Sequence, residues 1–230
     1  MCLGQFRLPD GHTLEMQLPF TDPIWFIKAP FERVVTETTE WLNGLGGRSF
    51  TRLREPLPSM LHHLEPWAMP SWKQLVVSTS ADQWTAVFSQ GSDIGTANVV
   101  GARLDSLNIR TSHQPHITRD RKIVSYGSTA LWIHSGARHI RSIQASYQSR
   151  WLWTLFGDPQ PFENLDSYTA KKIPDRFTLE SLNEYCHALG IERDNSGFYE
   201  SEGLLIEEDT SSWTRKPSQV NSTERLRDTI

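Results

Sequence analysis

Three stretches of the chain carry apolar residues at the spacing of an α-helix. In residues 30–45 the apolar positions include Phe31, Val34 and Leu42, while Glu37 and other acids occupy the opposite side. This pattern predicts a surface helix with one hydrophobic face laid on a core. The same spacing predicts helices over 96–107 and 178–189, and a short proline-flanked helix within 56–70.

Between these stretches the pattern changes to an alternation of period two, which is typical of β-strands. Residues 73–79 and 84–89 are separated by a turn and predict a hairpin with one aromatic face. The following part of the chain predicts a meander with strands at 109–114, 123–126 continuing through 129–134, 140–148 and 151–156. Residues 151–156 are apolar on both faces, so we expect this strand to lie in the middle of a sheet.

These elements predict an α+β fold, with a mainly antiparallel sheet of at least five strands packed with about three helices. We expect one domain over residues 1–207, because no long linker interrupts it, and a polar, flexible tail over 208–230. The side chains expected to be mostly buried are Trp41, Trp84, Phe88, Leu104, Trp151, Trp153, Leu182 and Leu189.

Nine tryptophans are a high number for 230 residues, and aromatic side chains dominate cores and interfaces, so we expect most of them in the core and one or two on a binding surface. The two cysteines, Cys2 and Cys186, cannot form a disulfide framework, which favours a reducing compartment. The first ten residues show no signal-peptide pattern, and no apolar run approaches a membrane span. We therefore expect a cytoplasmic protein with no membrane partner.

Charge is distributed unevenly along the chain, although the net charge is only −4. Residues 103–150 contain eight Lys or Arg and two acids, whereas residues 156–209 contain thirteen acids and four Lys or Arg. These segments can neutralise each other across the fold, or the basic one can attract an acidic partner. In the second case, the candidate binding residues are Arg119, Arg121, Lys122, Trp132 and Arg138.

The best interpretation is a protein-binding module, such as a regulatory or toxin-neutralising protein, that recognises an acidic protein partner. A competing hypothesis is a nucleic-acid-binding protein that uses the same basic strands, at 109–141, with their aromatic residues. The sequence pI of about 6.1 makes a dedicated nucleic-acid binder the less favoured of the two.

Catalytic and cofactor motifs are absent from the sequence, which contains no phosphate-binding loop, dinucleotide fingerprint, nucleophile elbow, HExxH or paired CxxC. We therefore expect no cofactor and favour a protein that is not an enzyme. A metal-assisted hydrolase is the alternative, and it requires at least two members of one group of side chains to converge in a cleft. The group consists of His113, His116, Glu163, Asp166 and Asp175.

Several aromatic, glycine and helix-cap positions are shared with a known pattern. They are Trp41-Leu42, Trp84, Phe88, Gly91, Ile140-Arg141, Trp151, Gly157, Phe162-Glu163, Tyr168, Asp175-Arg176-Phe177-Thr178, Leu182, Tyr185, Leu189-Gly190-Ile191 and Phe198-Tyr199. Over roughly residues 25–200 the chain resembles a family of uncharacterised actinobacterial proteins. The resemblance implies a shared fold, and it implies no activity and no catalytic residue.

Overall fold

The computed structural model describes residues 22–65, 67–69, 72–90, 95–209 and 218–220. Its helices are α1 (Phe31–Leu45), α2 (Leu57–His62), α3 (Gly95–Arg103) and α4 (Leu179–Ala188), with 3-10 turns η1 (Ser167–Thr169), η2 (Ile173–Arg176) and η3 (Ser196–Phe198). Its strands are β1 (Ile24–Ile27), β2 (Arg48–Leu53), β3 (Trp67–Met69), β4 (Lys73–Thr79), β5 (Thr85–Ser89), β6 (Leu107–Gln114), β7 (Ile117–Arg119), β8 (Lys122–Ser125), β9 (Ser128–Ser135), β10 (Arg138–Gln148), β11 (Arg150–Phe156), β12 (Tyr199–Glu208) and β13 (Ser218–Val220).

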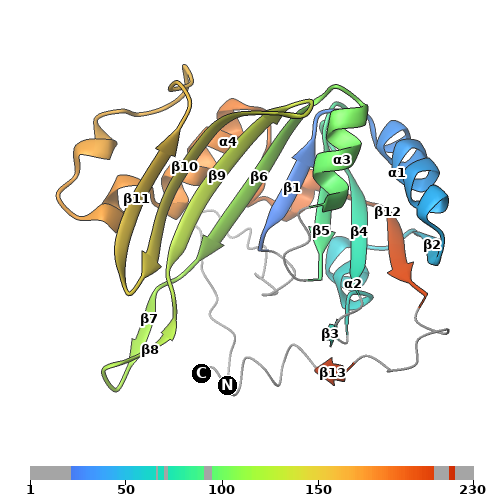
Figure 1. The fold of residues 1–230 in the computed structure, drawn as a ribbon. Helices are drawn as coiled ribbons and strands as arrows, with labels where there is room; N and C mark the ends of the chain where they lie inside the picture. Colours follow the sequence, from blue (N-terminus) through green and yellow to red (C-terminus); the bar gives the residue numbers. More distant parts are fainter. Residues whose placement is uncertain (1–21, 66, 70–71, 91–94, 210–217, 221–230) are drawn as a thin grey trace.

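Nine of these strands form one antiparallel sheet in the order β11-β10-β9-β6-β1-β5-β4-β12-β2 (Figure 1). The predicted α+β class and antiparallel sheet are therefore confirmed. Short hairpin turns join β4 to β5, β9 to β10 and β10 to β11, whereas β1 and β12 pair with strands distant in the sequence. β7 and β8 form a separate hairpin that projects beyond the sheet at the lower left of Figure 1.

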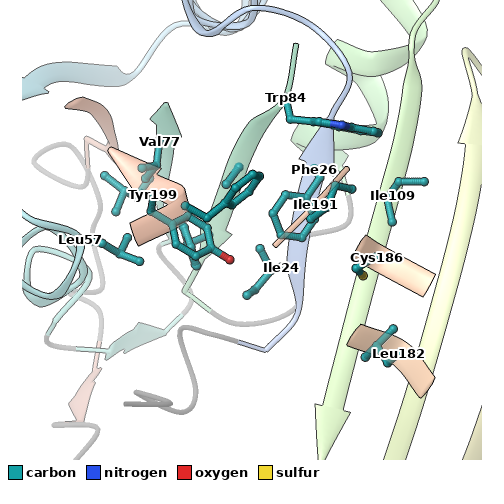
Figure 2. Close-up of a cluster of buried hydrophobic side chains, with 14 of the residues drawn as sticks. Ile24, Phe26, Leu57, Val77, Trp84, Ile109, Leu182, Cys186, Ile191 and Tyr199 are labelled. Atoms are coloured by element: carbon teal, nitrogen blue, oxygen red, sulfur yellow. The ribbon is translucent and has the colours of Figure 1, made fainter. Parts of the chain in front are cut away.

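Each face of the sheet carries its own hydrophobic core. One face packs against α2, α4 and the segment between α4 and β12, and Figure 2 shows part of this core, with Phe26, Trp84 and Leu182. The other face packs against α1 and α3, through residues such as Val34, Val76 and Val100. Because neighbouring residues of a strand point to opposite faces, the two cores draw on alternate positions of the same strands.

The helices follow the apolar stripes that predict them. In α1 the stripe residues Phe31, Val34, Val35 and Leu42 are buried. In α4 the Thr178 hydroxyl accepts a hydrogen bond from the Ser181 amide, which satisfies a free N–H of the first turn. These elements agree with the sequence because the periodicity and the end signals are local.

Two predictions were wrong in detail, and two strands were missed. The predicted helix at 96–107 ends at Arg103, since Asp105 takes a left-handed φ of 48° and Leu107 begins β6. The strand at 151–156 is an edge strand rather than a central one, with Leu155 43% and Phe156 51% exposed. β2 and β12 had not been predicted, and β12 lies inside the sheet between β4 and β2.

The expected burial holds for some of the chosen side chains and not for others. Trp84, Phe88 and Leu182 are fully buried. The partly exposed ones are Trp41, Leu104, Trp151, Trp153 and Leu189. The edge position of β11 explains Trp151 and Trp153, because only one side of an edge strand has a neighbour.

No helix in the described ranges is long and apolar enough to cross a membrane. Of the predicted tail, Ser218–Val220 forms β13 and pairs with β3. Glu208 ends β12 and Asp209 follows it, while residues 210–217 and 221–230 lie outside the described part. The alternation of Leu14, Met16 and Leu18 predicts a hairpin or short strands within residues 6–27, and the part of this segment before residue 22 also lies outside the described residues.

Candidate functional site

The two helices on the α1 side of the sheet cover only part of it. α1 and α3 pack over β1, β4, β5 and β12, and α3 also reaches the start of β6, whereas Figure 1 shows no described helix in front of β9, β10 and β11. We call this uncovered part the open face. Its side chains include Arg110 and Ser112 of β6, Ala130, Trp132 and His134 of β9, His139, Ser142, Gln144 and Ser146 of β10, and Arg150, Leu152, Thr154 and Phe156 of β11.

Gly101 sets the boundary between the covered and open parts. A Cβ atom at this glycine of α3 would lie 1.6 Å from Nδ2 of Asn108 on β6. The missing side chain therefore lets α3 approach β6 at Asn108, which is fully buried. Two residues farther along β6, Arg110 is on the same face and is partly exposed.

Arg110 lies between two tryptophans in one row across the sheet. Strand register places it opposite Trp25 of β1 on one side and Trp132 of β9 on the other. Its guanidinium carbon is 5.6 Å from the ring centroid of Trp25 and 4.3 Å from that of Trp132. Both distances are typical of cation–π contacts, so the two rings hold the charged group in place.

No carboxylate within the described ranges forms an ion pair with Arg110. Its pKa is lowered because burial disfavours the charged form, and the charge of Asp22 offsets this effect only in part. Asp22 itself accepts a hydrogen bond of 2.9 Å from the His113 amide. Arg110 is thus a half-buried cation without an ion pair in the described part of the chain, and only the charge of Asp22, beyond ion-pair distance, partly compensates it.

A second row on the open face stacks three rings. His134 lies 4.8 Å from His139, and His139 lies 4.4 Å from Phe156, with nearly parallel planes in both contacts. Burial lowers the pKa of His134, and the nearby charges of His139 and Arg110 lower it further. His134 is therefore neutral at pH 7 and adds a polar, uncharged ring beside Arg110.

Polar groups of this region are poorly satisfied in the described part of the chain. The buried side-chain atoms without a hydrogen-bond partner include Trp25 Nε1, Asn108 Nδ2 and Oδ1, Arg110 Nε and His134 Nδ1. Each such group has a cost in a folded protein and calls for an explanation. Their concentration in adjacent rows of one face marks this region as a candidate site.

On the opposite face of the same strands, a buried arginine forms an ion pair. Arg141 of β10 and Glu163 form two hydrogen bonds, of 2.9 and 2.7 Å, with side chains 2% and 0% exposed. Tyr168 donates a hydrogen bond to the same carboxylate, and Arg141 also donates to the Phe156 and Gly157 carbonyls. Burial acts to lower the pKa of Arg141, but Glu163 outweighs it and raises that pKa.

The predicted binding residues are divided between the two ends of the sheet. Arg119, Arg121 and Lys122 are exposed on the β7–β8 hairpin, while Arg138 is exposed at the turn between β9 and β10. β9 separates these two places by about 23 Å. Trp132 lies between them, in the middle of the open face, so the structure does not bring all five residues into one patch.

At the base of the hairpin the structure gathers four rings, which we call the aromatic cluster: His116, Tyr126, Tyr147 and Trp151. The ring of Tyr147 lies 4.7 Å from His116, 6.0 Å from Tyr126 and 5.7 Å from Trp151. A Cβ atom at Gly127 would lie 2.5 Å from His116 Cβ and 2.8 Å from the Trp151 ring, so the rings pack directly on its backbone.

The predicted acidic group and the two histidines lie in different environments. Glu163 is committed to Arg141, whereas Asp166 and Asp175 are exposed. His113 faces the α4 side, where its Nδ1 lies 3.0 Å from the Thr129 hydroxyl, and His116 belongs to the aromatic cluster. No group of three or more His, Cys, Asp or Glu among the described residues is placed to hold a metal ion.

Burial lowers the pKa of His113 to about 4, with help from the charge of Arg193. Cys186 is free and buried, and burial raises the pKa of its thiol to about 12. A thiol of this kind is protonated and unreactive at neutral pH. His113, which is partly buried, and Cys186, which is fully buried, are therefore uncharged residues on the α4 side of the sheet.

Sequence reasoning named Trp132 as a candidate binding residue, but it did not join this residue to Arg110 or Trp25. The pairing of Arg110 with Trp132 depends on the register of β6 and β9, which are separated by the β7–β8 hairpin. Trp25 comes from a strand 85 positions earlier than Arg110 (110 − 25). No local pattern links such positions.

The chain matches no known protein family, no curated protein and no solved structure. The resemblance to uncharacterised actinobacterial proteins therefore stays a prediction.

Proposed function

We propose that the protein is a recognition module that binds an acidic segment of a partner protein on the open face. The observation that carries the proposal is Arg110, a half-buried guanidinium held between Trp25 and Trp132 with no ion pair to a described carboxylate. A carboxylate from a partner would supply the ion pair that no described side chain forms with Arg110. A regulatory or toxin-neutralising protein is the concrete form of this function.

A protein segment fits this face better than a nucleic acid does. Among the described residues, the open face carries Arg110 in its middle and Arg150 at the exposed start of β11, and two separate cations do not form the track that a phosphate backbone requires. The side chains around Arg110 are small or apolar, including Ala130, Ser142 and Phe156. Such a surface can take the alternating side chains of an extended chain around one charged anchor.

A cytoplasmic location remains part of the proposal. It rests on the small number of cysteines and on the free, buried state of Cys186.

The test uses two synthetic peptide libraries of equal length, with a central glutamate in one and a central glutamine in the other. Fluorescence anisotropy would measure binding to the full chain. We expect the glutamate library to yield binders, and Arg110→Met to weaken them about tenfold or more, since a charge-assisted contact is lost. Trp132→Ala should weaken them as well, because the guanidinium loses one of its two supporting rings.

The matched control replaces Arg119, Arg121 and Lys122 with glutamate, which changes three exposed cations outside the open face. This control should bind the peptides within a few-fold of the wild type. If both libraries bind equally, or if the control loses binding while Arg110→Met keeps it, the open face is not the recognition site. Binding of single-stranded oligonucleotides that depends on Arg110 would assign the face to nucleic acid instead.

A further inference from the structure

The β7–β8 hairpin carries three cations in an exposed and unpaired state. Arg119, Arg121 and Lys122 surround a single acid, Asp120. In the described part of the chain none of these three cations forms an ion pair. The surroundings therefore favour an anionic ligand.

The turn of this hairpin keeps one of these cations in a strained backbone conformation. Asp120 and Arg121 have φ angles of 49° and 63°, as a two-residue turn with both central residues left-handed requires. Aspartate tolerates the first position, but glycine is favoured at the second. The presence of arginine at a turn position that favours glycine points to a function for the charge of Arg121.

The aromatic cluster provides flat surfaces at the base of the hairpin that carries these cations. Its outermost ring, Tyr126, contacts only Tyr147 among the described rings and is 57% exposed. His116, which is also exposed, joins the hairpin base to Tyr147 and Trp151. Rings of this kind can stack with unpaired bases.

We infer that the aromatic cluster and the β7–β8 hairpin together bind single-stranded nucleic acid, independently of the open face. A single strand offers planar bases for Tyr126 and His116 and phosphates for the three cations of the hairpin. An acidic peptide would use the cations and leave the rings without partners. A duplex hides its bases and would contact the cations alone.

The experiment measures fluorescence anisotropy of a short labelled oligothymidylate with the full chain. Three phosphate contacts predict a slope of about −2 for the logarithm of affinity against the logarithm of salt concentration. Tyr126→Ala should weaken binding about tenfold or more, while Tyr126→Phe should keep it, because stacking needs the ring and not the hydroxyl. Arg121→Gly should reduce the slope by about 0.7 and leave the hairpin intact, since glycine suits this turn.

Arg110→Met is the matched control and should bind the oligonucleotide like the wild type, so the two proposals can fail separately. Three results would each overturn the inference: no binding at low salt, equal affinity for a duplex of the same sequence, and unchanged affinity of Tyr126→Ala. Competition by the glutamate peptides of the first test would show that the hairpin binds acidic protein segments instead.

Discussion

Arg141 and Arg110 lie on opposite faces of the same half of the sheet, and the fold treats them differently. Arg141 is covered by the segment after β11, which brings Glu163 and Tyr168 to it. Arg110 is held by two tryptophan rings and has no such covering segment among the described residues. The difference teaches that an unpaired charge marks a surface open to a partner, whereas a paired one marks a core contact.

The largest effect is expected where the paired arginine loses its carboxylate. Glu163→Ala should lower the free energy of unfolding by about 3–5 kcal/mol, because Arg141 would stay buried without a counter-charge. Urea denaturation measures this value. The exposed pair of Arg52 and Glu32 is the control, and Glu32→Ala should cost less than about 1 kcal/mol. Equal losses in the two variants would contradict the assigned difference between buried and surface pairs.

The covered face should also show a pH dependence through His113. Its pKa of about 4 in the folded protein lies below the ordinary value of 6.5, so the unfolded chain binds more protons between these values. Stability should therefore fall as the pH is lowered from 6.5 towards 4, by on the order of 2 kcal/mol from this group. Denaturation of the wild type and His113→Gln across this range should show a flatter profile for the variant. Parallel profiles would show that His113 titrates normally.

The boundary between the covered and open parts depends on Gly101. Gly101→Ala should destabilise the protein by about 1–3 kcal/mol, since its Cβ would collide with Asn108 and α3 would have to shift. Adding Asn108→Ala removes the obstacle and should recover part of the loss. Thermal unfolding of the two single variants and the double variant measures this coupling. If the stability changes of the two single variants simply add in the double variant, contact between Gly101 and Asn108 does not limit the approach of α3.

The smallest effect on stability is expected at the unpaired arginine. Arg110→Met should change the free energy of unfolding by less than about 1 kcal/mol, because the lost ring contacts are offset by the removal of a half-buried charge. Urea denaturation of Arg110→Met and Glu163→Ala under the same conditions makes the comparison direct. A loss as large as that of Glu163→Ala would assign Arg110 to the structure rather than to binding.

The sequence predicted those parts of the fold whose signals are local. The stripe of α1, the Thr178 cap of α4 and the β4–β5 hairpin each lie within one short stretch. β12 was missed because its apolar centre, Gly203 to Ile206, is flanked by acids and resembles a polar tail. Its partners β2 and β4 are more than 100 positions away, and a single sequence does not display such a pairing.

The candidate site was less predictable than the fold. Counting charges drew attention to Arg119, Arg121 and Lys122, which the structure places on a projecting hairpin. The row of Trp25, Arg110 and Trp132 exists only after three strands have aligned. Whether a charge has a partner depends on tertiary contacts, as Arg141 shows, and therefore could not be inferred from the residue alone.

The most direct test of the account is a heteronuclear NMR titration that resolves arginine Nε signals, with the best glutamate peptide as ligand. Arg141 Nε already donates to Glu163, whereas Arg110 Nε has no partner among the described residues. The account predicts that the Arg110 signal and the Trp132 indole signal move with the same affinity, while the Arg141 signal stays in place. Movement of the Arg119 and Arg121 signals without a change at Arg110 would contradict it.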